Sequence, residues 1–333
     1  MKSVADVTVA GESARPRQGD RSGQMSVVVP VIERPADLAD LYREYAEPLR
    51  AMGRPFEFIF VVEPWFRELT GPLVELAKRG EPIQVLEVGQ AMGEASLVKL
   101  GAAHVGGEII LTLPAYHRVE AAALTELADR LKRGTDLVVA RRWPRRDSWI
   151  NRLQSWALHA LLGRLAGGSL RDVACGVRVM RRELLDEIPL YGDFYRFLPL
   201  LALREGYRIQ EVPCRQHPKD VGARVYSPGV YLRRLIDVLG LFFLLRFTEK
   251  PLRFFGLLGT FFAAFGGVVL VVLFVQRLLG QGLADRPLLL LGVLLLVLGV
   301  QAIALGLIGE IIVHLHAHRR RPYRLAQPPA PRP

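Results

Sequence analysis

Two long apolar segments near the C-terminus constrain the fold of this chain more than any other feature. Residues 254–275 and 288–309 each contain 22 residues and no charged side chain. A helix of this length spans about 30 Å of hydrocarbon, and within lipid only helices and closed barrels satisfy their own backbone polar groups. We therefore predict two transmembrane helices in preference to buried helices of a soluble core.

The charges around these segments predict their orientation. The connector at 276–287 carries two Arg and one Asp, whereas the outer flanks carry Arg246, Lys250, Arg253, Arg319, Arg320, Arg321 and Arg324. Because cytoplasmic flanks carry the excess of Lys and Arg, both termini are expected in the cytosol and the connector outside. The expected location is the cell inner (plasma) membrane, as a multi-pass protein.

The chain before the membrane segments has the pattern of an α/β domain. Short apolar runs typical of buried strands occupy residues 26–32, 56–62, 83–88, 108–113 and 136–140. Segments of helical length and periodicity separate them, which predicts βαβ units and a mostly parallel sheet flanked by helices. Ligands of such sheets bind outside the carboxyl ends of the strands. Beyond residue 140 we expect an amphipathic helix at 149–165 and strands at 175–180 and 208–213.

Composition shifts divide the chain further. We expect a disordered leader without a signal-peptide core, then a cytosolic domain, an interfacial amphipathic helix, the two membrane helices and a basic, Pro-rich tail. Their predicted ranges are 1–24, 25–227, 228–250, 251–318 and 319–333.

The net charge of +11 fits anionic lipid or phosphorylated small molecules. No nucleic-acid-binding motif accompanies the charge, so nucleic acid is not an expected partner. Cys175 and Cys214 lack metal-ligand spacing and are expected to be free thiols. His314, His316 and His318 suggest a metal cluster, but only the first and third share a helical face, so interfacial packing is the preferred interpretation.

Three motifs in the second half carry a family resemblance. Residues 172–178 read Asp-Val-Ala-Cys-Gly-Val-Arg, residues 196–199 Arg-Phe-Leu-Pro, and residues 206–213 end in Glu-Val-Pro. In this order, and with two membrane helices after them, they resemble the polyprenyl-phosphate glycosyltransferases, a family-2 group related to dolichyl-phosphate mannose synthase. The resemblance covers about residues 26–325. It implies a GT-A (Rossmann-like) fold, a nucleotide-sugar donor and a polyprenyl-phosphate acceptor.

The first half departs from the family where the donor diphosphate would bind. The family has an Asp-x-Asp pair that holds Mg²⁺ or Mn²⁺, whereas this chain has Pro114 and Tyr116 at those positions. We therefore predict no metal ligands there and no certain cofactor. Fixed Arg side chains, with Arg142 among the candidates, are expected to stabilise the leaving diphosphate instead.

The resemblance also implies roles for particular residues. Asp172 and Arg178 are the catalytic candidates. The donor-binding candidates are Pro30, Glu33, Glu63, Tyr116, Arg118, Arg141 and Arg224, and the acceptor-binding candidates are Arg196, Arg215 and Tyr226. Alternatives stay open: Asp172 as the cap of a turn, Glu63 as an ordinary loop carboxylate, and each Arg as a solvated or lipid-facing surface charge.

Two hypotheses follow for the function. The first is a membrane-anchored glycosyltransferase that transfers a sugar from a nucleotide sugar to a polyprenyl phosphate or related lipid, without an Asp-x-Asp-bound metal. The alternative is a catalytically inactive homologue that binds a lipid phosphate or a partner membrane protein. Whether the chain forms a homo-oligomer is left open.

Overall fold

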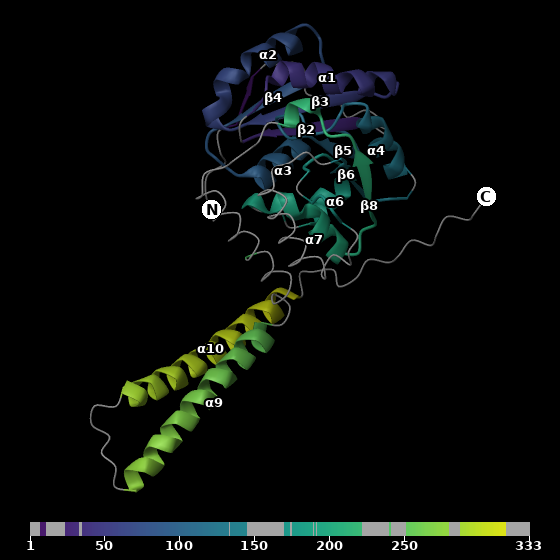
Figure 1. Cartoon of the computed structure of the whole chain (residues 1–333). Helices are drawn as coiled ribbons and strands as arrows, with labels where there is room; N and C mark the ends of the chain where they lie inside the picture. The colour runs from purple at the N-terminus through teal and green to yellow at the C-terminus, as the bar shows by residue number, and fades with distance from the viewer. Residues whose placement is uncertain are drawn as a thin grey trace, which may run out of the picture. The chain divides into compact units, whose positions relative to one another are not determined.

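The computed structural model describes residues 7–10, 24–32, 35–132, 134–144, 170–173, 175–188, 190, 192–221, 240, 251–279 and 287–317. The chain divides into two compact units, Met1–Asp237 and Val238–Pro333. The first unit contains the α/β domain and the second contains the two long apolar helices (Figure 1).

Within the described residues, the first unit is built on an eight-stranded mixed sheet of order β1-β4-β3-β2-β5-β7-β6-β8. The strands are β1 (Val7–Ala10), β2 (Met25–Val31), β3 (Phe56–Val62), β4 (Ile83–Val88), β5 (Ile109–Thr112), β6 (Leu137–Arg142), β7 (Arg178–Arg181) and β8 (Ile209–Cys214). Strands β4, β3, β2 and β5 are parallel, as are β6 and β8, whereas β1 and β7 run antiparallel to their neighbours. The predicted mostly parallel sheet is confirmed.

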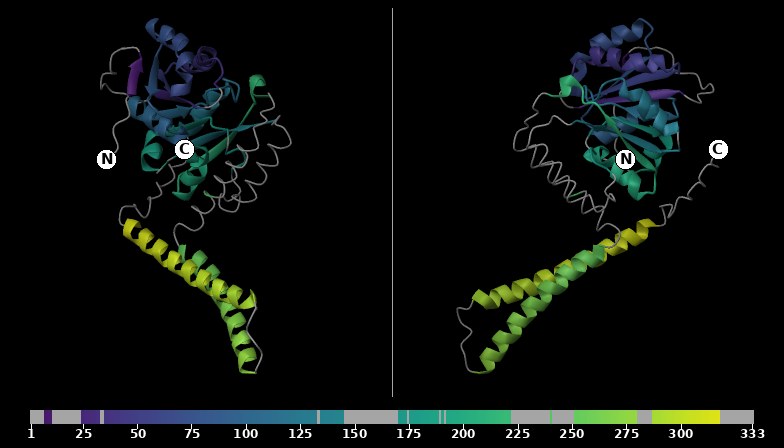
Figure 2. Two further views of the ribbon diagram at one scale, coloured as in Figure 1. Left: turned by 90° about the vertical axis from the view of Figure 1, so that its left-hand side faces the viewer. Right: turned by 45° about the vertical axis from the view of Figure 1, so that its right-hand side comes forward.

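Helices cover both faces of this sheet, as Figures 1 and 2 show. One face packs against α1 (Leu38–Ala51), α2 (Gly71–Lys78) and α4 (Ala123–Lys132). The other packs against α3 (Glu94–His104), α6 (Arg182–Glu187) and α7 (Leu198–Arg204). Because side chains alternate along a strand, Val27 and Val29 of β2 enter the first core and Val28 enters the second. Such two-sided burial explains the continuous apolar runs in the sequence.

The strand order reverses beside β2. The chain runs from β2 outward to β3 and β4, and then returns to place β5 on the other side of β2. This reversal makes the carboxyl ends of β2 and β5 a topological switch point, where α/β sheets bind their ligands. Short 3-10 helices complete the domain: η1 (Pro64–Leu69), η2 (Gly192–Phe197) and η3 (Pro218–Val221).

Two sequence predictions need correction. Residues 7–10 were expected within a disordered leader, but they form β1, which pairs antiparallel with β4. Their Val-Thr-Val run is β-branched, and β4 offers an open edge for it. The strand expected at 175–180 begins only at Arg178, because Gly176 has a left-handed φ of +82° that breaks extended pairing. Residues 149–165 and nearly all of the predicted interfacial helix lie outside the described residues.

The second unit contains α9 (Pro251–Leu278) and α10 (Pro287–Ala317). Both are long and apolar enough to cross a membrane, with hydropathies of 2.5 and 2.8. Their most apolar windows are only 17% and 11% buried, unlike the core helices of a soluble protein. The predicted pair of candidate membrane helices is therefore confirmed, with somewhat longer bounds.

Glycines bring α9 and α10 into close contact. A Cβ on Gly259 would lie 2.6 Å from the Gly299 carbonyl oxygen, and one on Gly266 would lie 2.7 Å from the Gly292 carbonyl oxygen. Small residues at these crossings let two backbones approach closely, as in membrane helix pairs. At the other end of the pair, Glu310 Oε2 accepts the Leu252 N–H at 3.3 Å and satisfies one of the free amides at the start of α9.

Candidate functional site

The loop after β5 lies where the resemblance expects the metal-binding pair. Pro114 and Tyr116 occupy those positions, and neither side chain offers a carboxylate. The Pro114 ring packs against Gly176, where an added Cβ would lie 2.9 Å from Pro114 Cγ. The Thr112 hydroxyl donates to the Gly176 carbonyl at 3.2 Å and holds the two segments together. Mg²⁺ and Mn²⁺ prefer carboxylate oxygens as ligands, and the Pro114 and Tyr116 side chains supply none. The usual metal site of the family therefore does not fit this loop.

A buried ion pair lies beside this loop, at the carboxyl end of β6. Arg142 Nε and Nη2 lie 2.8 Å and 2.9 Å from the two carboxylate oxygens of Asp172, and the Arg142 backbone N–H donates to Oδ2 at 3.1 Å. The side chains are only 3% and 2% exposed. Two parallel hydrogen bonds fix both groups in orientation. Asp172 is thus held in place by β6, while its catalytic role stays a prediction.

Two further charged residues extend the pair into a group that we call the charge cluster: Arg118, Arg142, Asp172 and Asp220. Arg142 Nη1 lies 3.5 Å from Asp220 Oδ2, and Arg118 Nη1 lies 3.6 Å from Asp220 Oδ1. The Arg118 guanidinium also lies 5.0 Å from the centre of the Tyr116 ring. The cluster therefore reaches the loop where the resemblance expects the metal site, and it combines two cations with two carboxylates.

Arg141, a predicted donor-binding residue, points to a different carboxylate. Its Nε lies 3.9 Å from Glu211 Oε2, and its guanidinium lies 5.6 Å from the Trp143 ring. Glu211 Oε1 accepts the backbone N–H groups of Arg171 and Asp172 at 2.8 Å and 2.7 Å. The Glu of the Glu-Val-Pro motif thus anchors the segment that presents Asp172.

Arg178, the second catalytic candidate, is fully buried. It donates to the backbone carbonyls of Tyr195, Val173 and Arg196 at 2.6, 3.0 and 2.8 Å. These bonds tie the Asp172 loop to η2. The contacts therefore support a positioning role for Arg178, and a catalytic role stays a prediction.

Glu63 contacts backbone amides. Its Oε1 accepts the N–H groups of Met92 and Gly93 at 3.1 Å and 3.3 Å, immediately before α3 begins. The positive end of the α3 helix dipole stabilises a carboxylate at this position. The side chain thus joins the end of β3 to the start of α3, and a contact with the donor stays a prediction.

Three of the remaining candidates belong to the described residues. Pro30 is buried in β2 opposite Val61. Arg196 is partly exposed, and Arg215 is exposed just beyond β8. Glu33, Arg224 and Tyr226 lie outside the described residues, as does His318.

One group of titratable residues was missed by the sequence reasoning. Asp40 and Glu44, one turn apart on α1, approach His117 in the loop after β5, and His217 lies beside them. The two imidazole rings stack with centroids 4.7 Å apart. Burial lowers the pKa of His117, so its ring is neutral near pH 7. The i, i+4 spacing of the acids was visible in the sequence, but the approach of the histidines was not.

Both cysteines are free and buried, as expected. Burial raises the pKa of Cys175 to about 11 and that of Cys214 to about 12. Thiols of this kind are structural and poorly nucleophilic.

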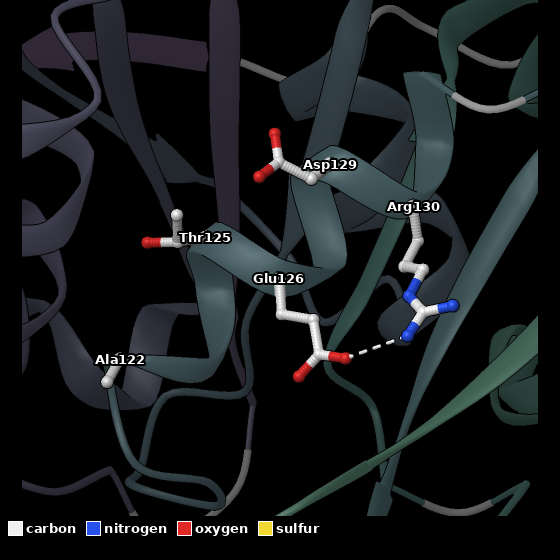
Figure 3. Close-up of a pocket in the computed structure, with 5 residues that line it drawn as sticks. All are labelled: Ala122, Thr125, Glu126, Asp129 and Arg130. Carbon is white, nitrogen blue, oxygen red and sulfur yellow. Dashed lines mark hydrogen bonds and ion pairs between the residues drawn. The ribbon is translucent and has the colours of Figure 1, made fainter.

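A surface pocket lies elsewhere, on α4 and the turn before it (Figure 3). Its lining residues include Glu126 and Arg130, which form an ion pair that is drawn in Figure 3. Their nearest charged atoms lie 3.2 Å apart. None of the predicted site residues lines it. The pocket is therefore unconnected with the charge cluster.

The family follows from comparison with known sequences. Residues 26–189 match Glycosyl transferase family 2. The chain carries a domain of this family and is a glycosyltransferase.

A relative extends the similarity beyond the matched family domain. The chain is 26% identical over 302 residues to dodecaprenyl-phosphate galacturonate synthase from Rhizobium johnstonii, and 89% of each chain is covered. Among solved structures, glucosyl-3-phosphoglycerate synthase from Mycobacterium tuberculosis, in complex with Mn²⁺, uridine-diphosphate and phosphoglyceric acid, aligns with a TM-score of 0.49 and 19% identity. That alignment covers 66% of this chain and 78% of the other.

Proposed function

We propose that this glycosyltransferase transfers a sugar from a nucleotide sugar to a polyprenyl phosphate at a membrane. The observation that carries the proposal is the similarity to a dodecaprenyl-phosphate galacturonate synthase, which covers 89% of the chain and is therefore too long to be confined to the α/β domain. A lipid acceptor must be met at a membrane surface, and α9 and α10 would anchor the domain there.

The reaction would be a direct displacement at the anomeric carbon. A phosphate oxygen of the lipid forms the new bond to the sugar, the bond to the nucleoside diphosphate breaks, and the configuration inverts. Because the lipid phosphate is already an anion, it needs little help from a general base. We infer that the main task of the protein is to orient the two substrates and to stabilise the leaving diphosphate.

The charge cluster supports an Arg-based stabilisation of the leaving group. Arg142 is paired with Asp172, whereas Arg118 lies farther from Asp220 and beside Tyr116, at the loop that lacks the metal ligands. We propose that Arg118 faces the diphosphate and that Asp172, oriented by Arg142, positions the acceptor. Arg141 and Arg224 are further candidates for contacts with the donor.

A transfer assay tests this proposal. Membranes containing the full chain are incubated with polyprenyl phosphate and a panel of radiolabelled nucleotide sugars, with and without EDTA. We expect transfer to persist in EDTA, and loss of all transfer on chelation would refute the Arg-based mechanism. Asp172→Asn is expected to lower kcat by about 10²-fold, because the acceptor is no longer held in position. Asp186→Asn, at an exposed position on α6, is the matched control and should behave as wild type.

The inactive-homologue hypothesis keeps one observation in its favour. Pro114 occupies a position where the resemblance expects a metal ligand, and its ring offers no oxygen ligand. Calorimetry separates the two hypotheses. Purified protein that binds polyprenyl phosphate but no nucleotide sugar would favour the inactive homologue.

A further inference from the structure

One imidazole and two carboxylates meet between the first turns of α1 and the loop after β5. Their ligand atoms, one each from Asp40, Glu44 and His117, all lie within 4.8 Å of one another. His117 Nε2 lies 3.0 Å from Glu44 Oε2 and 3.8 Å from Asp40 Oδ2. Two ligands at about 2.1 Å from one ion lie roughly 3.0–3.5 Å apart. The Glu44–His117 separation falls in this range and the Asp40–His117 separation lies just above it, so small side-chain movements would bring these groups to one ion.

The state of His117 points to a missing partner. Its side chain is only 2% exposed, and among the described residues none makes a hydrogen bond to Nε2. A buried polar atom without a partner is costly. Although Glu44 Oε2 is near, its direction does not suit a hydrogen bond. A neutral ring with its lone pair at Nε2 would face two carboxylates, and a cation among the three groups would convert this repulsion into attraction.

His217 orients the Glu44 carboxylate from the other side. The Lys219 backbone N–H donates to His217 Nδ1 at 3.1 Å, so Nδ1 is an acceptor and Nε2 is the nitrogen that can donate. That Nε2 lies 2.9 Å from Glu44 Oε1. His217 therefore holds one oxygen of Glu44 and leaves the other facing His117. Outer groups that orient a ligand in this way are usual at metal sites.

Lys219 supplies the positive charge that now lies against this group. Its Nζ lies 2.6 Å from Asp40 Oδ2, and the two side chains are 56% and 45% exposed. Hydrogen bonding to Lys219 lowers the pKa of Asp40. Because the ammonium is on a long exposed side chain, it can move into solvent when an ion binds to Asp40.

We propose that Asp40, Glu44 and His117 bind a divalent transition-metal ion such as Zn²⁺, and that the ion ties α1 to the loop after β5. The imidazole favours Zn²⁺ over Mg²⁺ and Ca²⁺, which prefer oxygen ligands alone. These residues are different from Pro114 and Tyr116. The proposal concerns metal binding by the chain and does not require the proposed transfer reaction.

Calorimetry on the full chain in detergent tests the site. The protein is stripped with EDTA, desalted and titrated with Zn²⁺, with Mg²⁺ as a second probe. We expect Zn²⁺ to bind and to raise Tm, and Mg²⁺ to do neither. Glu44→Gln and His117→Asn should each weaken Zn²⁺ binding at least 10-fold. Lys219→Met should strengthen it, because the competing ammonium is gone.

Matched controls separate this site from other histidines and acids. Glu47→Gln lies on the exposed side of α1, and His104→Asn replaces an exposed histidine of α3; both should bind Zn²⁺ as wild type does. Equal Zn²⁺ affinity in wild type and Glu44→Gln would overturn the proposal, and so would a Lys219→Met variant that binds more weakly. If His117→Asn fails to fold, the other two variants still decide the question. Glu44→Gln should bind Zn²⁺ more weakly than wild type, and Lys219→Met should bind it more tightly.

The two proposals fail in distinguishable ways. Absent transfer with intact Zn²⁺ binding would reject only the proposed function. Transfer that is lost both in EDTA and in Glu44→Gln, but kept in Glu47→Gln, would show that the reaction needs this ion and would reject the Arg-based mechanism. Unaltered transfer without Zn²⁺ binding would reject only the metal site.

Discussion

At the scale of single residues, the candidate site is organised by buried contacts of charged groups. Arg142 and Asp172 are paired at hydrogen-bonding distance with almost no exposure. Removing charges from water is costly. The pair persists chiefly because one buried charge without its partner would destabilise the fold more than the buried pair does. The pair therefore fixes geometry more than it adds stability.

A mutant cycle tests this account of the Arg142–Asp172 pair. Arg142→Met should lower the free energy of unfolding by about 3–5 kcal/mol, because Asp172 keeps an uncompensated buried charge. The double variant Arg142→Met/Asp172→Leu should lose less than the sum of the two single variants. Urea unfolding followed by circular dichroism provides the measurement. Arg130→Met, which breaks the exposed Glu126–Arg130 pair, should have little effect.

A second prediction concerns Gly176 and the substituted metal loop. Gly176→Ala places a Cβ at a φ of +82° and 2.9 Å from Pro114 Cγ. Left-handed strain and the steric clash should together cost about 2–4 kcal/mol. Gly206→Ala is the control, because its φ is +83° but nothing lies within 4 Å of the added Cβ. Its free energy of unfolding should fall only by the cost of the left-handed strain. An equal fall in both variants would contradict tight Pro114–Gly176 packing.

At the scale of elements, the apolar helices pair through glycine contacts. Gly259 and Gly299 face each other in the α9–α10 contact, whereas Gly267 of α9 has open space around its Cβ position. Dispersion contacts and close backbone approach drive helix pairing in lipid. The positions of these glycines along α9 and α10 therefore determine which faces of the two helices meet.

Gly259→Leu should separate α9 from α10. The new side chain would overlap the Gly299 carbonyl and Ile303, so we expect a loss of about 1–3 kcal/mol or more and a lower Tm in detergent. Gly267→Leu adds the same volume at an open position and should leave Tm unchanged. A reversed order of the two Tm values would show that the pairing face is different.

At the scale of the element order, the sequence pattern predicted the sheet well. Runs of apolar residues between helical segments identified β2 to β6, because local hydropathy and periodicity carry that information. The antiparallel placement of β7 between β5 and β6 and the addition of β1 at the edge were not predictable from local pattern. Both depend on pairings between segments far apart in the chain.

At the scale of the whole molecule, the chain joins an α/β glycosyltransferase domain to a pair of apolar helices. The basic residues outside the two helices predict cytosolic termini. The full chain should stay with the membrane after carbonate extraction. Alkaline phosphatase fused after residue 333 should be inactive, and the same reporter in the 279–286 connector should be active. An active C-terminal fusion would contradict the proposed topology.

Local patterns of hydropathy and charge were enough to indicate the membrane helices, the alternating strands and helices, the family motifs and the missing Asp-x-Asp pair. They could not indicate that Arg142 pairs with Asp172, that Arg178 bonds to backbone carbonyls, or that His117 meets Glu44 of α1. Periodicity reports which face of an element is buried, because side-chain directions repeat about every two residues along a strand and about every 3.6 along a helix. Which charged side chains share a buried site depends on the packing of distant elements, and that emerges only when the sheet has assembled.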